Sequence, residues 1–383
     1  MTSRDRLITA LDHREPDRVP FDLGSTFVTG ITRGAWAGLL AELGETARPE
    51  PAILDPVQQL VVADQDILDR LGVDTTSLVR HLPARAPLNE REDGEYLMFD
   101  DAWGIGWRMP KAQRLYYDMF IHPLAGKTLE DAKAHPWPDP TKNFDRAMVR
   151  DLARRLHEET DKGIIVGGFG SGILEMTLWL QGFDQGYMNL LADKPLTCYL
   201  LDKITDLKMA YAELVLEAAG DYCHVFYSGD DVGHQSGPAM RRELFQELMP
   251  PRYKRLNEFI KLKAPHLKIF FHTCGCVYPL LPDLIEAGID ILNPVQVNAA
   301  EMGDTKRLKR EFGRDLTFWG GIDTQHIMPH GTPEEVKDEV RRRLEDLAPG
   351  GGYVFDTVHN IQADVPGRNI VALAEALDEY GWY

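Results

Sequence analysis

A complete helix-and-strand unit is visible in residues 332–355, which read TPEEVKDEVRRRLEDLAPGGGYVF. Thr332 and Glu335 have the spacing of a capping box, and Pro333 suits the first helical position. Three glycines then end the helix and lead into a short apolar run, Tyr353–Phe355. Between the two ends, the apolar residues recur at helical spacing and form one stripe, Val336, Val340, Leu344 and Leu347. The segment therefore predicts an amphipathic helix followed by a buried strand.

The same alternation recurs along the chain. Short, continuously apolar runs suit parallel strands that are buried on both faces. Eight such runs are found: Val19–Leu23, Val73–Val79, Ile164–Gly167, His224–Tyr227, Ile269–Phe271, Ile289–Leu292, Leu316–Trp319 and Tyr353–Phe355. Eight strands that alternate with helices predict an α/β fold, the (β/α)8 TIM barrel. The first two runs depart most from the pattern, because Pro20 weakens one and Thr75-Thr76-Ser77 makes the other polar.

One stretch after the second predicted strand interrupts this alternation. Residues 80–125 contain Tyr96–Phe99 and Trp103–Trp107, which resemble short β-hairpins. We interpret the stretch as a hairpin insertion over the rim of the barrel, serving as a lid or an oligomer contact. A helical extension is expected at the N-terminus. Because no linker, repeat or low-complexity tract divides the chain, we expect residues 1–383 to form a single domain.

The composition limits the location and the partners of the protein. The 383 residues carry 42 Lys+Arg and 60 Asp+Glu, a formal net charge of −18, which argues against nucleic acid or an anionic membrane as a partner. Four cysteines are too few for a disulfide framework and indicate a reducing compartment. The first twenty residues lack the apolar core of a signal peptide, and the most apolar stretch, residues 163–174, is too short to span a bilayer. We expect a cytoplasmic protein.

Polar and glycine-rich residues gather directly after the predicted strands. In a barrel these strand ends meet at the C-terminal face, where active sites of this fold lie. The backbone N–H groups of Gly168, Gly170 and Ser171 would suit an anion or a flat cofactor, and a tight turn explains the same glycines equally well. Asp230 and Asp231 are adjacent, so we expect only one of them to face the site. Further candidates at later strand ends are Asn293, Gln296 and Asp323.

The sequence His272-Thr273-Cys274-Gly275-Cys276 follows the fifth predicted strand. In an extended segment, side chains two residues apart share one side, so His272, Cys274 and Cys276 can converge. Imidazole and thiolate are ligands that zinc prefers, and a catalytic zinc takes three protein ligands and keeps one position open. The third ligand would be Cys276 or His359, at the end of the last strand. The alternative is that the cysteines are small buried hydrophobes and His272 is a hydrogen-bonded core residue.

Several motifs together resemble the uroporphyrinogen decarboxylase superfamily, almost from end to end of the chain. They are Arg18-Val19-Pro20, Trp179-Leu180-Gln181-Gly182-Phe183, Gly229-Asp230-Asp231 leading to Gln235-Ser236-Gly237-Pro238, His272-Thr273-Cys274-Gly275, Asp290-Ile291-Leu292-Asn293-Pro294-Val295-Gln296 and Gly320-Gly321-Ile322-Asp323-Thr324-Gln325. The resemblance implies a (β/α)8 barrel. True decarboxylases of this superfamily bind the porphyrinogen carboxylates with an arginine-rich N-terminal segment. Here the corresponding stretch is Phe21-Asp22-Leu23-Gly24-Ser25-Thr26, with no arginine until Arg33, which disfavours decarboxylation.

The chain is more similar to the other branch of the superfamily, the cobalamin-dependent methyltransferases. Their zinc motif is His-x-Cys followed by a late Cys. His272 and Cys274 match its first two positions, His359 stands at the third, and Cys276 is the substitute. The resemblance implies methyl transfer between a corrinoid and a small methylated substrate, or a thiol or hydroxyl acceptor, as in O-demethylase systems. Under this interpretation the substrate would be oriented by Asp231, Asn293, Gln296 and Asp323.

The corrinoid is expected on a partner protein, because the chain has no Asp-x-His-x-x-Gly cobalamin-binding motif. Members of the superfamily are often homodimers, and the oligomeric state of this chain stays open. Two alternatives from other classes stay open: a cofactor-free decarboxylase of the uroporphyrinogen decarboxylase type, and a non-catalytic protein that binds a corrinoid or a metal.

Overall fold

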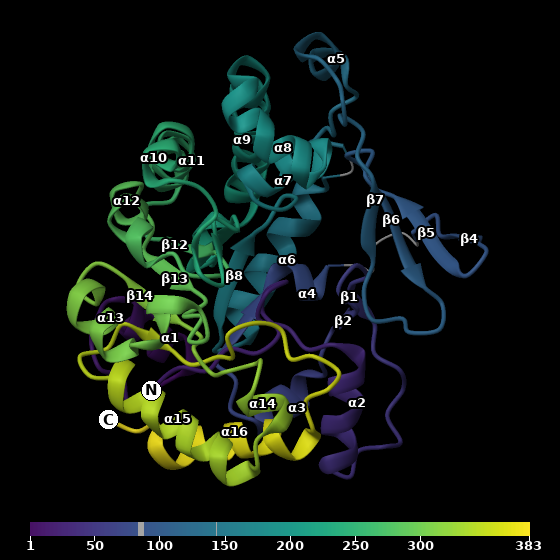
Figure 1. Ribbon diagram of the computed structural model, residues 1–383. Coiled ribbons are helices and arrows are strands. Elements are labelled where there is room, and N and C mark those ends of the chain that lie inside the picture. Colours follow the sequence, from purple (N-terminus) through teal and green to yellow (C-terminus); the bar gives the residue numbers. More distant parts are fainter. Residues whose placement is uncertain (83–87, 143) are drawn as a thin grey trace.

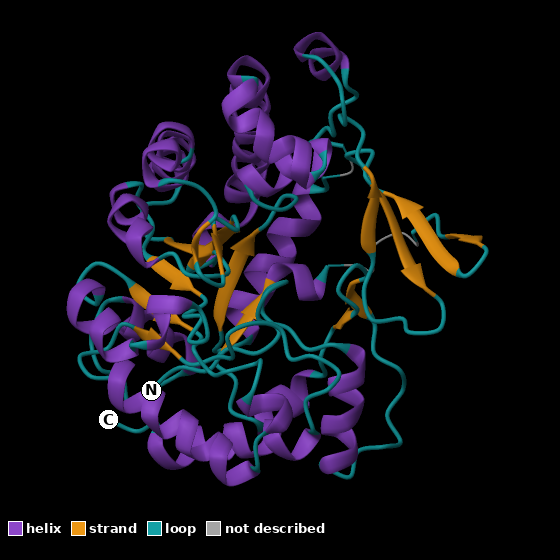
Figure 2. Cartoon of the chain, viewed as in Figure 1, coloured by secondary structure: helices purple, strands orange, loops and turns teal. Residues whose placement is uncertain are grey.

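A curled parallel sheet surrounded by helices forms the centre of the protein (Figures 1 and 2). The computed structural model describes residues 1–82, 88–142 and 144–383. Within these residues the sheet has seven strands in the order β15-β14-β13-β12-β9-β8-β3. Their bounds are β3 Thr75–Ser77, β8 Gly163–Gly167, β9 Val225–Gly229, β12 Lys268–His272, β13 Ile291–Asn293, β14 Thr317–Trp319 and β15 Tyr353–Val354. Seven of the eight predicted strands are therefore present.

The first predicted strand, Val19–Leu23, is not a strand, and this part of the prediction was wrong. The segment makes a single parallel bridge, between Phe21 and Phe355. It nevertheless lies between the two edge strands, because Asp22 N donates to Phe355 O (3.0 Å) and Asp74 N donates to Phe21 O (2.7 Å). Pro20 has no N–H to continue a ladder. An irregular eighth segment thus closes the (β/α)8 barrel.

The predicted second strand, Val73–Val79, is also shorter than expected. It ends at Ser77, and Leu78 and Val79 already belong to helix α4. In contrast, the unit at residues 332–355 is confirmed, because Thr332 and Glu335 form the predicted capping box at the start of α15.

Helices lie around the sheet with these bounds: α1 Ser3–Leu11, α2 Arg33–Glu42, α3 Gln65–Arg70, α4 Leu78–His81, α5 Leu129–Ala134, α6 Arg146–Glu159, α7 Ile173–Gln181, α8 Phe183–Ala192, α9 Lys194–Ala219, α10 Arg242–Leu248, α11 Pro250–Lys263, α12 Leu281–Glu286, α13 Thr305–Phe312, α14 Ile327–His330, α15 Pro333–Leu347 and α16 Gly367–Tyr380.

The barrel interior is a packed apolar core. Inward side chains from successive strands form one buried cluster, which includes Ile165, Val225, Phe270, Ile291, Trp319 and Val354. The predicted N-terminal helical extension is α1, and its Leu7 joins this cluster. A Cβ at Gly163, the first residue of β8, would lie only 2.2 Å from Leu7 Cδ2. Because α1 packs where β8 begins, it covers the N-terminal end of the barrel. The opposite, C-terminal end is the one that is open to a functional site.

The insertion after the second strand is an antiparallel sheet in the order β4-β5-β6-β7 (Figure 1). Its strands are β4 Arg91–Asp93, β5 Tyr96–Asp100, β6 Gly106–Pro110 and β7 Asp118–Ile121. Trp103 packs on Phe169 after β8 (ring centroids 5.7 Å apart), and Trp107 packs on Trp179 of α7 (5.5 Å). The hairpin insertion is therefore confirmed, and it contacts the C-terminal side of the barrel. Part of the predicted stretch, residues 83–87, lies outside the described residues.

Two short strand pairs complete the secondary structure of the described residues: β1 Ile53–Asp55 with β2 Leu60–Val61, and β10 Gly233–His234 with β11 Gly237–Pro238. Among the helices in the described part of the chain, none combines the length and the hydropathy needed to cross a lipid bilayer.

Candidate metal centre

Three side chains from two distant segments converge at the C-terminal mouth of the barrel. His272 is the last residue of β12, Cys274 lies two residues further on, and His359 follows β15. One ligand atom from each lies within 4.8 Å of the other two. Cys274 Sγ is 3.4 Å from His272 Nε2, and the two imidazole centroids are 5.2 Å apart. Tetrahedral zinc bonds of about 2.0–2.3 Å would separate the ligand atoms by about 3.3–3.5 Å, which the Cys274–His272 pair already matches.

The position of His272 follows from the alternation of side chains along β12. Phe270 points into the barrel core and Phe271 points outward to the helices, so His272 points inward at the mouth. Its neighbour across the sheet is Gly229 of β9. A Cβ at Gly229 would lie 2.8 Å from His272 Cβ, so a glycine is required for this close approach. The histidine is therefore held by the strand and not by a loop.

Asn293 determines which nitrogen of His272 faces the cluster. The Nδ1–H of His272 donates to Asn293 Oδ1 (2.6 Å), and Asn293 Nδ2 donates to Trp319 O (3.2 Å). This arrangement leaves Nε2 as the atom available to a metal. Asn293 is fully buried at the end of β13, and both ends of its amide are used by the protein. The structure thus places it as a positioning residue for His272.

Both imidazoles are held in the neutral form that binds metals. Burial lowers the pKa of His272 to about 4. Burial, together with the nearby His272, lowers the pKa of His359 to about 3. The His359 segment is fixed by its neighbour Asn360, whose Oδ1 accepts from Gly30 N (2.6 Å). Neutral, fixed imidazoles favour a cation because no proton has to be displaced.

Asp231 supports the cysteine of the cluster. Its Oδ1 accepts from Cys274 N (2.7 Å) and lies 3.8 Å from His272 Nε2. Burial raises the pKa of the Cys274 thiol well above its usual value, and the negative charges of Asp231 and Glu175 raise it further. The thiol is therefore protonated when no cation is present. A divalent ion reverses this preference, because it stabilises the thiolate directly.

Asp230 points away from Asp231, as expected for adjacent residues. Its carboxylate accepts from Leu174 N (2.7 Å), Glu175 N (2.9 Å) and the Tyr253 hydroxyl (2.8 Å). It therefore caps the start of α7.

Glu175 is a buried carboxylate near the site that the sequence analysis did not single out. Its Oε2 accepts from Gly172 N (3.1 Å), and burial next to Asp231 raises its pKa to about 7. The signal in the sequence was a glutamate in the first turn of a helix that starts after a glycine, which predicts a helix start but not a carboxylate near the cluster.

The other predicted site residues brace the loops around the cluster. Gln296 Oε1 accepts from Gly275 N (2.5 Å), which fixes the loop that carries Cys274. Asp323 accepts from Gln325 N (2.7 Å), His326 N and Asn298 Nδ2 (both 2.9 Å). Cys276 is buried in the main hydrophobic core and is not part of the three-residue group found among the described residues. The geometry therefore favours His359 over Cys276 as the third ligand.

The glycine-rich loop after β8 lies beneath the insertion. Gly168 and Gly170 have φ of +82° and +65°, so both use conformations that favour glycine. A Cβ at Gly170 would lie 3.1 Å from the Trp103 ring. Lys208 Nζ donates to the carbonyl oxygens of Phe169 and Ser171. The space beside Gly170 is thus filled by Trp103, and cofactor binding by Gly168, Gly170 and Ser171 stays a prediction.

Comparison with known proteins identifies the family. Residues 102–380, well over half of the chain, match the family model "Uroporphyrinogen decarboxylase (URO-D)". The chain belongs to the uroporphyrinogen decarboxylase family. Among the relatives in this family is the uroporphyrinogen decarboxylase of Actinobacillus succinogenes, which is 26% identical over 293 residues, or 75% of this chain and 77% of the relative.

Relatives in the uroporphyrinogen decarboxylase family also include a methyltransferase. The methylated-thiol–coenzyme M methyltransferase of Methanosarcina mazei is 24% identical over 269 residues, or 67% of this chain and 65% of that protein. A solved methyltransferase structure from Methanosarcina mazei covers 99% of both chains with a TM-score of 0.65 and 20% sequence identity. The structural likeness confirms the barrel fold over the whole chain.

Proposed function

We propose that the protein is a zinc-dependent methyltransferase that moves a methyl group between a small substrate and a corrinoid carried by a partner protein. The observation that carries the proposal is the convergence of His272, Cys274 and His359 at the barrel mouth, with ligand atoms within 4.8 Å of one another. The methyltransferase of Methanosarcina mazei supports methyl transfer. The corrinoid and the partner rest on the resemblance of the His-x-Cys motif to that of cobalamin-dependent enzymes.

The donor set fits zinc. One thiolate and two neutral imidazoles give a site with a net charge of +1, and three protein ligands leave the fourth position open. Zinc bound there would hold a thiol or hydroxyl group as its anion near neutral pH. His272 is oriented for this role by Asn293, and the backbone of Cys274 is held by Asp231. The chain's own task is to keep these groups fixed while a methyl group moves in line.

Decarboxylation is disfavoured by the N-terminal segment of the barrel. Residues 21–26 contain no arginine and are all buried. The nearby Arg18 forms a buried ion pair with Asp74 (2.7 Å) and is therefore not available to a carboxylated substrate. A porphyrinogen with several carboxylates needs such cations. The decarboxylase alternative is supported by the names of the family model and of several relatives.

The test of the proposal is methyl transfer from methylcobalamin to a panel of small thiols and phenols, with wild type compared with His272→Ala. We expect transfer by the wild type and its loss in the variant. His330→Ala is a suitable control, because His330 is exposed at the end of α14 and is not part of the three-residue cluster. Release of CO2 from a carboxylated substrate, without methyl transfer to any acceptor, would instead support the decarboxylase.

A further inference from the structure

Four charged side chains lie together beside the metal cluster: Glu175, Lys208, Asp230 and Asp231. They come from the first turn of α7, the middle of α9 and the segment directly after β9. Lys208 balances part of the negative charge, because its ammonium group lies near Asp230 and Glu175. The same group donates to the carbonyl oxygens of Phe169 and Ser171. The proposed function gives a role to Asp231 alone.

Asp230 is fully committed to holding α7 against the barrel. It is completely buried, and its carboxylate accepts from two N–H groups of α7 and from the Tyr253 hydroxyl. Its own backbone N donates to His272 O (2.8 Å). A Cβ at Gly172 would lie only 2.0 Å from Asp230 Oδ1. The first turn of α7 is therefore fixed directly beside the strand end that carries His272.

Glu175 lies in this first turn and differs from Asp230 in being partly exposed. Its Oε2 accepts from Gly172 N (3.1 Å). Burial and the charge of Asp231 raise its pKa, whereas hydrogen bonds from Ser171 and from the Asp231 backbone act in the opposite direction. These opposing effects leave a carboxyl group that can take up or release a proton near neutral pH.

Asp231 connects Glu175 to the metal cluster. Its backbone N–H bonds to Glu175, and its own carboxylate Oδ1 accepts from Cys274 N (2.7 Å). The same oxygen lies 3.8 Å from His272 Nε2. One residue thus separates Glu175 from two of the three proposed ligands. Because Asp231 Oδ1 already holds the backbone of a ligand, Glu175 is the carboxylate beside the cluster whose bonds do not include a ligand residue.

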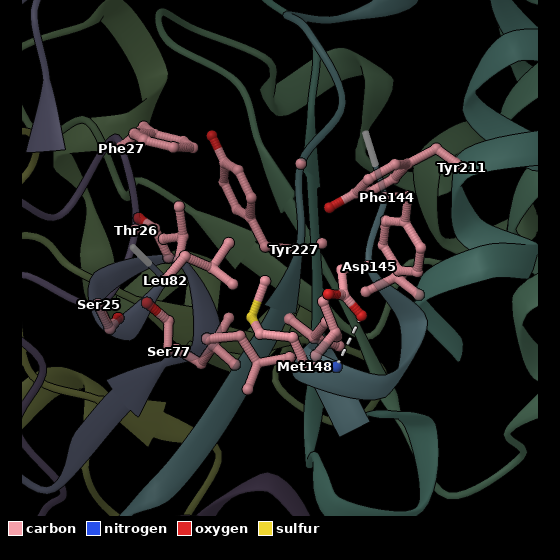
Figure 3. A pocket seen from close by; sticks show the side chains of 18 residues that line it. Ser25, Thr26, Phe27, Ser77, Leu82, Phe144, Asp145, Met148, Tyr211 and Tyr227 are labelled. Atoms are coloured by element: carbon pink, nitrogen blue, oxygen red, sulfur yellow. Dashed lines mark hydrogen bonds between the residues drawn. The ribbon is translucent and has the colours of Figure 1, made fainter. Parts of the chain in front are cut away.

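The tyrosines around Glu175 cannot accept a proton. Burial raises the pKa of Tyr187 and of Tyr227, and the nearby carboxylates raise both further, so the two hydroxyls stay protonated. Tyr227 also lines a cavity of about 210 Å³ (Figure 3). Among the lining residues that the structure describes, the charged side chain is Asp145, which caps α6 by accepting from Met148 N (3.0 Å). The cavity side of Tyr227 therefore offers no competing base.

We propose that Glu175 accepts the proton that a thiol or hydroxyl substrate loses when it binds at the metal cluster. The inference rests on the proposed methyl transfer. The S–H or O–H bond breaks, its electron pair stays on the sulfur or oxygen, and the proton moves to a Glu175 oxygen. In the reverse direction, the Glu175 carboxylic acid returns the proton to the sulfur or oxygen that the methyl group has left.

Proton release on thiol binding tests the inference without methyl transfer. Zinc-loaded protein is titrated with 2-mercaptoethanol at pH 7 by calorimetry, in two buffers of different ionisation enthalpy, which gives the number of protons released. Glu175→Gln should release about one proton per thiol, and wild type at least about 0.3 fewer, because Glu175 retains part of it. Asp184→Asn is the matched control, because Asp184 is an exposed carboxylate at the start of α8, and it should match wild type.

Infrared difference spectra give a second measurement that needs no variant. Thiol binding to the wild type should remove a carboxylate band and add a protonated carboxyl band. Glu175→Gln keeps the side-chain size and an acceptor oxygen for Gly172 N, and it should show neither change. Absence of both changes in wild type that binds the thiol overturns the inference.

The outcomes separate the role of Glu175 from the proposed function. Equal proton release by wild type and Glu175→Gln, with zinc content and thiol affinity unchanged, overturns the inference and leaves methyl transfer standing. Zinc-loaded wild type that binds no thiol overturns both. Lower release by wild type and Asp184→Asn than by Glu175→Gln supports Glu175 as the proton acceptor. That result stands even if methyl transfer fails in every assay, in which case only the proposed function is lost.

Discussion

Replacing Asn293 by alanine should weaken zinc binding although Asn293 is not a ligand. Asn293 Oδ1 accepts the Nδ1–H of His272 at 2.6 Å, in a fully buried position. Without this acceptor the imidazole is free to rotate or to change tautomer, and Nε2 no longer faces Cys274. The substitution therefore acts on the orientation of a ligand, and not on the number of ligands.

The size of the effect follows from the contacts that are lost. Removing a hydrogen-bond partner from a metal-binding histidine costs about 10–100-fold in metal affinity, equivalent to about 1.4–2.7 kcal/mol. The Trp319 carbonyl also loses its bond from Asn293 Nδ2. The loss of two hydrogen bonds leaves the buried Nδ1–H of His272 without an acceptor. This should lower the free energy of unfolding by about 2–3 kcal/mol.

The assay is zinc competition against a chromophoric chelator, with wild type, Asn293→Ala and Asn293→Asp compared at one pH. The aspartate variant keeps an acceptor for His272 Nδ1–H, so its affinity should stay within about threefold of wild type. Circular dichroism checks that each variant is folded. A folded alanine variant with unchanged zinc affinity would refute the positioning role of Asn293.

Two further predictions concern contacts at the metal cluster, and a third concerns a buried histidine at the opposite end of the sheet. Cys274→Ala should abolish stoichiometric zinc binding, whereas Cys276→Ala should retain it. Metal analysis that showed loss of zinc in Cys276→Ala as well would make Cys276 a ligand. Gly229→Ala places a carbon 2.8 Å from His272 Cβ and should weaken zinc binding by about tenfold, measured by the same chelator competition. His224 accepts from Ile164 N (3.0 Å), and burial lowers its pKa to about 4. Because the unfolded chain binds this proton below about pH 6.5 and the folded chain does not, His224 should reduce stability as the pH falls from 6.5 to 4, by up to about 3 kcal/mol. His224→Gln in the zinc-free protein should remove this component from urea unfolding curves, and an unchanged pH slope would contradict it.

The parts of the site that the sequence could predict are those set by local periodicity. His272 and Cys274 lie two residues apart after a strand, so their convergence followed from alternation alone. The third ligand is different, because it comes from the last segment of the barrel and depends on how the sheet closes. Residue spacing alone could not decide whether Cys276 or His359 is the third ligand. The geometry of the barrel mouth favours His359.

The parts that could not be predicted depend on pairing across strands. The bond from His272 to Asn293 requires the register of β12 and β13, which brings these two residues side by side. Glu175 lies near Asp231 only because α7 starts beside the end of β9. Similarly, the irregular segment at Val19–Leu23 replaces a strand because Pro20 cannot donate a ladder hydrogen bond, although the segment still fills the eighth position.

The most direct test of the account is the metal content and zinc-edge X-ray absorption of the purified protein. We predict about one equivalent of zinc per chain, bound by one sulfur at about 2.3 Å and two imidazole nitrogens at about 2.0–2.1 Å. The signal should disappear in His359→Ala. Less than about half an equivalent of zinc, or a shell with two sulfurs that survives in His359→Ala, would contradict the proposed centre.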